Sequence, residues 1–207
     1  YVFVILHANP LVSVPRSDKR IAGVMAVFNT TNPAVSNYGK QEPPQDIGMD
    51  SFEFWCPQRR PVGHNISMKF GKPLDSFKAG NIRNGINRPT TAPNAWVADF
   101  RDAHPALTLQ WERPVRIKKI LLSFDTDFDH PMESVLMLHP EQIMPFCIRN
   151  YRIYDDQRRL LVERKGNYQT RNVIELENEI LSTELRIEPE HPSVQSPAAV
   201  FSVRCYS

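Results

Sequence analysis

The sequence is short of several features that would assign it to a particular class of protein. Its three cysteines, Cys56, Cys147 and Cys205, are an odd number without Cys-x-x-Cys spacing, so we expect buried free thiols rather than a zinc site or a disulfide framework. No apolar run approaches the roughly 20 residues that span a bilayer, and no basic leader precedes the opening YVFVIL. We therefore expect neither a membrane anchor nor a signal peptide.

An excess of charge of one sign is also missing. Lys and Arg total 25 against 23 Asp and Glu, which leaves a formal net charge of +2 spread along the chain. Proteins that bind nucleic acid usually gather positive charge on one face. Nucleic acid is therefore not an expected partner.

Local signatures of catalysis are absent as well. The sequence has no strand-Gly-x-Gly-x-x-Gly-helix segment to hold a dinucleotide and no Gly-x-Ser-x-Gly elbow. Cys147 alternates with Arg149 beside Tyr151 and Ile153, which predicts an inert buried thiol. We expect a chain that is not an enzyme. A metal-assisted or paired-carboxylate hydrolase stays open as an alternative, because carboxylates distant in sequence can meet in space.

The composition that is present favours β structure. Eighteen prolines against eight glycines, with 11 Phe, 6 Tyr and 3 Trp, suit short strands between rigid loops. Turn residues bound seven predicted strands, which together predict an antiparallel β-sandwich. The seven strands span residues 107–111, 116–128, 146–155, 160–163, 172–176, 184–187 and 199–205.

One of these strands shows a clear alternation. In residues 118–128, Ile120, Leu122, Phe124 and Phe128 are predicted to face the core. The opposite face, which is predicted to meet water or a ligand, carries Lys119, Ser123, Asp125 and Asp127.

The first part of the chain is predicted to be a β-rich extension, residues 1–71, joined to the sandwich of residues 72–207. Apolar stretches at 1–6, 11–14 and 21–28 predict strands of an antiparallel meander. A loop rich in Pro and Asn follows at 30–48, and alternating stretches at 51–57 and 65–70 predict two more strands. The one predicted helix is short, at 133–138 between two His-Pro pairs.

A group of residues around one tryptophan fits sugar recognition. An aromatic ring can stack under the apolar face of a sugar while polar side chains satisfy its hydroxyls. Trp96 has Arg88, Asn94 and Asp99 close by in sequence, in a loop-rich segment. We predict a carbohydrate site here. Trp55 and Trp111 lie in strand patterns and are predicted to be core residues.

The acidic run Asp125, Asp127 and Asp129 is a second candidate site. Its carboxylates share one face of a strand but stand about 6.6 Å apart, too far to converge on a calcium ion unless the strand curls. Calcium or another ligand is one interpretation, and a solvated strand end is the other. His130 and His139 follow in a loop, where they either contact a ligand or are ordinary exposed or hydrogen-bonded histidines, because their spacing matches no zinc signature.

Three segments in order resemble the discoidin, or coagulation-factor type C, domain: NIRNGINRPTTAPNAWVAD, LTLQWERPVRIKKILLSFDTDF and CIRNYRIYDDQRRLLVERKGNYQTRNVIEL. The resemblance implies a galactose-binding-like jelly-roll fold and a structural calcium near Asn81 and Asn84, for which a simple Asn-Gly turn is the alternative. It also implies that Trp96 packs within the sandwich. The matching residues are Asn81, Asn84, Gly85, Trp96, Pro114, Ile117, Ile120, Tyr151, Asn167, Gln169, Arg186, Ile187, Arg204 and Tyr206.

Taken with further segments, the sequence as a whole is similar to the C-terminal region of bacterial secreted FAD-dependent oxidoreductases. The segments that carry this likeness are FVILHANPLVSV, SDKRIAGVMAVFN, DSFEFWCP, DFDHPMESVLMLHPE and MPFCIRNYRI. The likeness implies a fragment of a longer, secreted or periplasmic protein whose upstream catalytic domain binds FAD. The chain itself would then either bind carbohydrate as an accessory module or pack against the flavin domain and support its fold or dimerisation.

Overall fold

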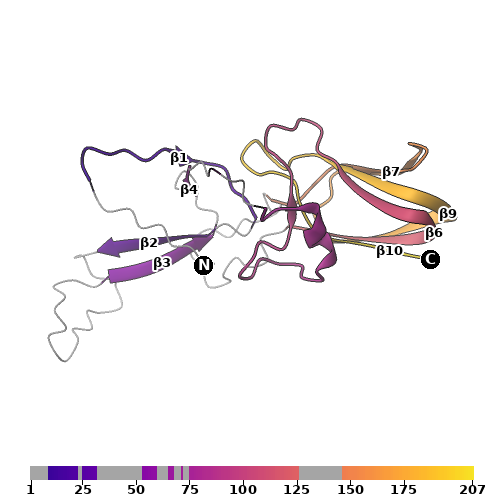
Figure 1. The fold of residues 1–207 in the computed structure, drawn as a ribbon, viewed down its shortest axis with the longest axis horizontal. Helices are drawn as coiled ribbons and strands as arrows, with labels where there is room; N and C mark the ends of the chain where they lie inside the picture. The colour runs from indigo at the N-terminus through magenta and orange to yellow at the C-terminus, as the bar shows by residue number, and fades with distance from the viewer. Residues whose placement is uncertain are drawn as a thin grey trace, which may run out of the picture.

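The computed structural model describes residues 9–22, 25–31, 53–59, 65–67, 71, 75–125 and 146–207 (Figure 1). Its largest part is an antiparallel sheet of six strands in the order β5-β10-β6-β9-β7-β8, so the predicted all-β class is confirmed. The strands are β5 (Trp96–Val97), β6 (Leu107–Phe124), β7 (Tyr151–Asp155), β8 (Leu160–Arg164), β9 (Arg171–Pro189) and β10 (Ala199–Tyr206). A 3₁₀ helix, η1 (Ala79–Arg83), was not predicted.

The two long strands, β6 and β9, connect the two layers of the sandwich. The second half of β6 pairs with β10 and with the first half of β9. The first half of β6 pairs with the second half of β9, which also pairs with β7. Each long strand therefore has different neighbours at its two ends. Figure 1 shows both strands running to the right-hand end of the molecule.

Two register shifts interrupt the pairing of β6 with β9. The first lies between Gln110 and Val115 and includes Pro114, which has no N–H to donate. The second lies between Ile117 and Lys119, and between them Lys118 Nζ donates to the carbonyl oxygens of Leu176 at 2.7 Å and Glu177 at 2.8 Å. Bulges bend a strand without ending it.

The bulges correct the predicted strand count. The strands predicted at 107–111 and 116–128 form one strand, β6, up to Phe124. Those predicted at 172–176 and 184–187 likewise form the single strand β9. The predicted strand at 146–155 begins only at Tyr151.

The main core lies between the two layers. Ile120, Leu122 and Phe124 are fully buried in it, as predicted. The Phe124 ring meets the Tyr151 ring edge-on, with centroids 5.2 Å apart, and so joins β6 to β7 across the core. The buried Tyr151 hydroxyl donates to Asn172 Oδ1 at 2.8 Å, which satisfies its hydrogen bonding inside the sandwich.

The N-terminal part forms two small sheets rather than the predicted meander. β1 (Arg16–Ser17) pairs with β4 (Asn65–Ile66), and β2 (Met25–Thr31) pairs with β3 (Glu53–Arg59), so one pair is nested inside the other along the chain. The predicted strand at 11–14 is wrong: these residues are irregular, and Leu11 is 92% exposed. The predicted strand at 1–6 and helix at 133–138 lie outside the described residues.

Residues 9–22, which we call the N-terminal arm, contact the sandwich at their C-terminal end. Ala22 packs in a second apolar cluster with Ala95, Ala199 and Phe201, on the side of β10 that faces away from the main core. Arg20 donates its backbone N–H to Gln195 O at 2.8 Å. The arm therefore covers an otherwise exposed apolar stripe of β10.

No helix within the described ranges has the length and apolar character needed to cross a bilayer.

Candidate functional site

Two pockets of similar size open on the described surface of the sandwich. The first, of about 300 Å³, lies between η1 and the first half of β6, and we call it the Trp111 pocket. The second, of about 290 Å³, lies where β7 begins and where β8 and β9 end, and we call it the charged pocket. The two differ in the chemistry of their walls.

Trp111 supplies an aromatic wall because of its place at the first bulge of β6. Leu107, Leu109 and Trp111 alternate along the strand toward the main core. The pairing with β9 is interrupted immediately after Gln110, so the core does not close over Trp111, which stays half-buried. The indole ring both packs against the core and lines the pocket.

Polar residues also line this pocket. Arg83, at the last turn of η1, and Thr108 are exposed pocket residues. Gln110 donates its amide Nε2 to Glu184 Oε2 at 3.0 Å. Because that carboxylate only accepts, the bond directs the NH₂ group of Gln110 to Glu184 and leaves its Oε1 as an acceptor. The pocket thus has an aromatic residue and a cationic residue in its lining, with Thr108 and Gln110 on the same strand as Trp111.

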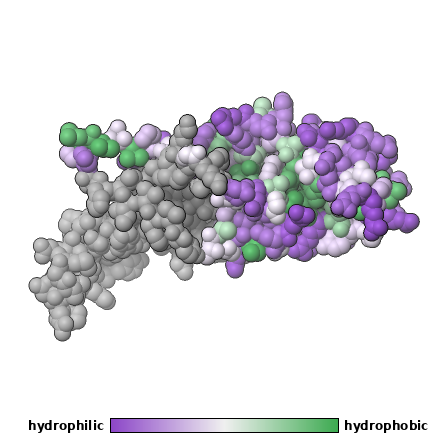
Figure 2. All heavy atoms as spheres, in the orientation of Figure 1, coloured by the Kyte–Doolittle hydropathy of each residue, from purple (hydrophilic) through white to green (hydrophobic). Residues whose placement is uncertain are grey.

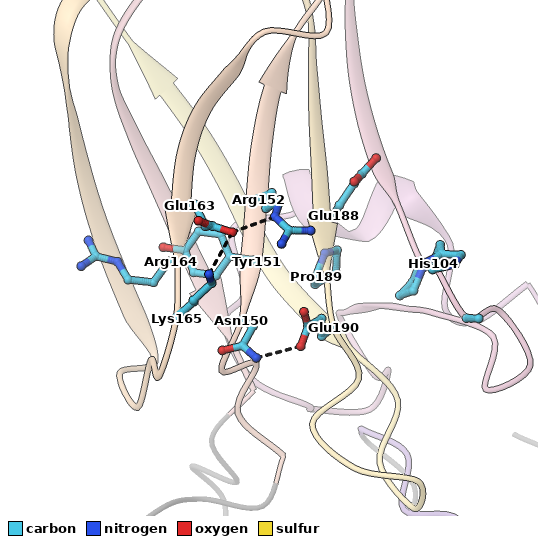
Figure 3. Close-up of a pocket in the computed structure, with 12 residues that line it drawn as sticks. His104, Asn150, Tyr151, Arg152, Glu163, Arg164, Lys165, Glu188, Pro189 and Glu190 are labelled. Atoms are coloured by element: carbon cyan, nitrogen blue, oxygen red, sulfur yellow. Dashed lines mark hydrogen bonds and ion pairs between the residues drawn. The ribbon is translucent and has the colours of Figure 1, made fainter.

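The charged pocket is lined by groups that already neutralise one another (Figure 3). Arg152 Nε donates to Glu163 Oε1 at 2.9 Å, and Lys165 Nζ lies 3.4 Å from the same oxygen. The hydrogen bond from Arg152 lowers the pKa of Glu163. Asn150 Nδ2 donates to Glu190 Oε2 at 2.7 Å.

This second pocket offers little aromatic surface. Among its lining residues Tyr151 is aromatic, but it is only 1% exposed and its hydroxyl is bonded to Asn172. A sugar ring would find no flat apolar face there. The chemistry of sugar recognition is therefore better matched by the Trp111 pocket.

Three of the predicted site residues, Asn84, Arg88 and Asn94, meet at the buried side-chain amide of Asn94. Asn94 is 5% exposed, and its Nδ2 donates to Arg88 O at 3.0 Å and to Thr90 Oγ1 at 2.8 Å. Its Oδ1 accepts from Asn84 Nδ2 at 3.0 Å. Its φ of 57° lies in the left-handed region, which Asn tolerates better than most residues. All of these bonds hold the loop together.

Trp96 and Asp99, the other two members of that prediction with Arg88 and Asn94, are placed apart from both pockets. Trp96 lies in β5 and is half-buried against the main core, as the discoidin resemblance implies. Asp99 is exposed, and its carboxylate accepts three bonds from Arg101: two from the guanidinium, at 2.7 Å and 3.1 Å, and one from the backbone N–H at 2.9 Å. The guanidinium bonds, followed by the backbone bond, lower the pKa of Asp99 to about 2. Their contact with a ligand stays a prediction.

The residues predicted near a structural calcium form a tight turn. Asn81 Nδ2 donates to Ser76 O and to Ala95 O, each at 2.8 Å, and so uses two carbonyls that would otherwise be free acceptors. Asn84 Oδ1 accepts from the backbone N–H of Ile86 at 2.8 Å, and Gly85 has a φ of 82°. The Asn-Gly turn is thus present. Calcium binding stays a prediction.

In the acidic run, Asp125 is described and is 3% exposed. Of the two interpretations of this face, exposure to water is wrong for Asp125 and for Ser123, which is also buried, and contact with a ligand stays a prediction. Asp127, Asp129, His130 and His139 lie outside the described residues. Among the side chains that the structure describes, no three of His, Cys, Asp or Glu are grouped closely enough to hold a metal ion.

The prediction of a buried free thiol is confirmed for Cys147. It is fully buried and unpaired, and burial raises the pKa of its thiol to about 11. Cys205 is half-buried and unpaired, and burial raises its pKa to about 11 as well. Neither thiol has the lowered pKa of a nucleophile. The side chain of Cys56 lies outside those described.

Comparison with solved structures places the sandwich among known folds. A family 32 carbohydrate-binding module from Streptococcus pneumoniae EndoD has a TM-score of 0.50 and 12% identity, over 67% of this chain and 90% of that one. The fold is the galactose-binding-like β-sandwich. The galactose complex of a family 32 module from C. perfringens NanJ has a TM-score of 0.47 and 14% identity, over 65% and 88% of the two chains. No family model and no curated protein matches the chain.

The predicted galactose-binding-like fold is therefore confirmed. The comparisons do not support an FAD-dependent parent, which stays a prediction. The Trp111 pocket is lined by residues that the sequence analysis did not name as site residues, among them Arg83, Gln110 and Trp111. Pro114 was a usable signal, because a proline soon after a strand tryptophan interrupts the pairing that would have buried the ring.

Proposed function

We propose that this chain is a carbohydrate-binding module that holds a sugar residue in the Trp111 pocket. The observation that carries the proposal is the half-buried Trp111 in the lining of an open pocket that the exposed Arg83 also lines. An indole face stacks on the C–H groups of a pyranose, while planar polar side chains bond its hydroxyls. The likeness of the fold to solved carbohydrate-binding modules supports the proposal.

The expected ligand is a neutral sugar or an acidic sugar whose carboxylate can pair with Arg83. Arg83 is the one charged side chain among the residues that line the pocket, and it can donate to two neighbouring hydroxyls. Calorimetry against a panel of neutral and acidic mono- and oligosaccharides tests the proposal, and the absence of binding to every one of them would contradict it.

Replacing Arg83 by methionine is expected to weaken sugar binding roughly 10- to 150-fold, since a hydrogen bond to a charged group contributes about 1.5 to 3 kcal/mol. Methionine keeps much of the length of the side chain but not its donors. The matched control is Arg88→Met, which changes an exposed arginine whose backbone carbonyl, and not its guanidinium, bonds Asn94. Titration calorimetry of both variants separates the two candidate sites: a loss in Arg88→Met alone would favour the loop around Trp96.

We propose, as a second function, that the chain packs against another domain of a longer protein. Leu11 and Val12 of the N-terminal arm are 92% and 62% exposed. Figure 2 shows hydrophobic surface at the upper left, where Figure 1 draws this arm. Exposed neighbouring apolar side chains mark sites of protein contact. The partner that the resemblance implies is the upstream catalytic domain of a secreted, FAD-dependent oxidoreductase.

The double change Leu11→Ser and Val12→Ser tests this second function. In the full-length protein it is expected to lower the thermal midpoint of the upstream domain by several degrees, because a covered apolar surface is lost. In the 207-residue chain the same change is expected to have no effect, since both side chains are exposed there. The control is Ser13→Ala in both proteins. An unchanged midpoint in the full-length variant would contradict packing by the arm.

A further inference from the structure

Arg83 carries the only charge among the residues that line the Trp111 pocket, and those residues include no Asp, Glu, Asn or His. The lining also includes Thr108 and Gln110, whose side chains have oxygens that accept hydrogen bonds. These two residues alternate with Leu109 and Trp111 along β6, so their side chains point to the opposite side of the strand from the indole. The pocket therefore offers a ligand on Trp111 a cationic donor and no anionic acceptor.

The guanidinium of Arg83 makes no ion pair and no hydrogen bond within the part of the chain that the structure describes. Other exposed arginines already bind a carboxylate. Arg101 lies 2.7 Å from Asp99 Oδ2, and Arg152, in the charged pocket, lies 2.9 Å from Glu163 Oε1. Unlike them, Arg83 keeps its N–H donors for a ligand.

The backbone that carries Arg83 is fixed on both sides. Ile82, just before it, is 5% exposed and belongs to the main core. Asn84, just after it, donates its backbone N–H to Asn81 O at 3.1 Å and its Nδ2 to Asn94 Oδ1 at 3.0 Å. The position of Arg83 at the pocket is thus set before a ligand arrives, which lowers the entropy cost of binding.

The ligand group that best matches this guanidinium is a carboxylate. Its two oxygens only accept, and the planar fork of arginine can bind both of them at once. A sugar hydroxyl bound by Arg83 would accept a bond but would still need an acceptor for its own proton. A pyranose ring with a carboxylate on a ring carbon offers C–H groups to an indole and an anion at its rim. The pocket volume of about 300 Å³ is at the small end of ligand sites, which suits a single ring.

We propose that the Trp111 pocket selects sugars whose pyranose ring carries a carboxylate, with Arg83 binding the carboxylate through two N–H groups while Trp111 packs on the ring. This inference rests on the proposed sugar binding in the same pocket. It names acidic sugars, rather than neutral ones, as the preferred class of ligand.

The test is titration calorimetry of the 207-residue chain with ligands that differ only at C6. The ligands are D-galacturonate, its primary amide and D-galactose, together with the corresponding compounds of the glucose series. At pH 7 the uronic acids are ionised. At about 20 mM salt each acid is expected to bind roughly tenfold more tightly than its amide, because a charge-assisted bidentate pair replaces a neutral bond.

Salt and substitutions of Arg83 separate a specific ion pair from general affinity. At about 0.5 M salt the advantage of the acid is expected to fall to roughly threefold or less, since an exposed cation is screened. Arg83→Met is expected to remove the difference between acid and amide. Arg83→Lys is expected to keep a reduced advantage of roughly threefold, because an ammonium is a point charge without the fork.

The matched control is Arg171→Met, which removes an exposed arginine that lines neither described pocket and is expected to keep the full difference. An acid that binds no more tightly than its amide at low salt would overturn the proposal. So would a preference for the acid that survives in Arg83→Met.

The outcomes also distinguish this inference from sugar binding itself. If none of the ligands binds, or if Trp111→Phe leaves every affinity unchanged, the Trp111 pocket is not a sugar site and both proposals are wrong. If all the ligands bind equally and Trp111→Phe weakens each of them, the sugar site stands and only the preference for a carboxylate is wrong.

Discussion

Replacing Trp111 by alanine is expected to abolish measurable sugar binding. The indole offers about 100 Å² of apolar contact to a stacked sugar, which at about 25 cal/mol per Å² is worth about 2 to 3 kcal/mol. That corresponds to a rise in Kd of roughly 30- to 150-fold. Weak sugar binding would then fall below the range of titration calorimetry, which is the measurement that checks the expectation.

Trp111 also packs against the main core, so loss of binding must be separated from loss of fold. Trp111→Phe keeps a smaller aromatic face and is expected to retain binding with a Kd raised by roughly tenfold. The control is Trp96→Phe, which alters a half-buried core tryptophan away from the pocket and is expected to leave Kd unchanged. If Trp96→Phe lost binding and Trp111→Ala did not, the sugar would lie in the loop around Trp96.

Replacing Asn94 by alanine is expected to lower the free energy of unfolding by about 3 to 4 kcal/mol. Three hydrogen bonds of the buried amide are lost, each worth about 1 kcal/mol. The left-handed backbone at this position is also about 1 kcal/mol less favourable for alanine than for asparagine. Urea unfolding followed by circular dichroism measures the change. A variant as stable as the parent would show that this amide network contributes nothing.

Asn94→Gly separates the two causes. Glycine loses the same hydrogen bonds but adopts a positive φ freely, so its loss is expected to be about 1 kcal/mol smaller than that of alanine. Sugar affinity should survive in the glycine variant under conditions where it is folded, because Asn94 does not line the Trp111 pocket. Loss of affinity in the folded variant would instead assign Asn94 the ligand contact predicted from its sequence neighbourhood.

Strand faces were predictable where the local alternation is clear. Ile120, Leu122 and Phe124 recur every second residue and are all buried, since successive side chains of a strand point to opposite sides. The same rule failed for Ser123 and Asp125, which also became buried. Alternation states which side chains share a face. It does not state whether another part of the chain covers the second face.

The covering of β10 illustrates this limit. Ala199 and Phe201 point away from the main core and are buried in the small cluster with Ala22, which precedes them by more than 170 residues. The continuous apolar run Ala199-Val200-Phe201 is a sequence signal for burial on both faces, and it was not used. Which segment supplies the cover is a long-range contact that no local pattern encodes.

The division of β6 and β9 failed for a related reason. Glu112-Arg113-Pro114 looks like the end of a strand, but the pairing resumes at Val115 because β9 follows the bend and Lys118 binds its carbonyls. Strand continuity depends on the partner strand, which is about 70 residues away. Strand pairing also decides that Trp111, rather than Trp96, borders an open pocket, because the bulge leaves Trp111 half-buried beside η1.

By itself the sequence determined an all-β chain, its main core positions and its galactose-binding-like fold, because these follow from side-chain alternation, turn residues and a recognisable order of segments. Only the tertiary structure decided which aromatic ring borders an open pocket, which asparagine side chains hold a loop through hydrogen bonds, and where the N-terminal arm contacts the sandwich. Those outcomes depend on strand register, bulges and contacts between distant loops. Such features are fixed when the whole chain packs, and no short stretch of residues contains them.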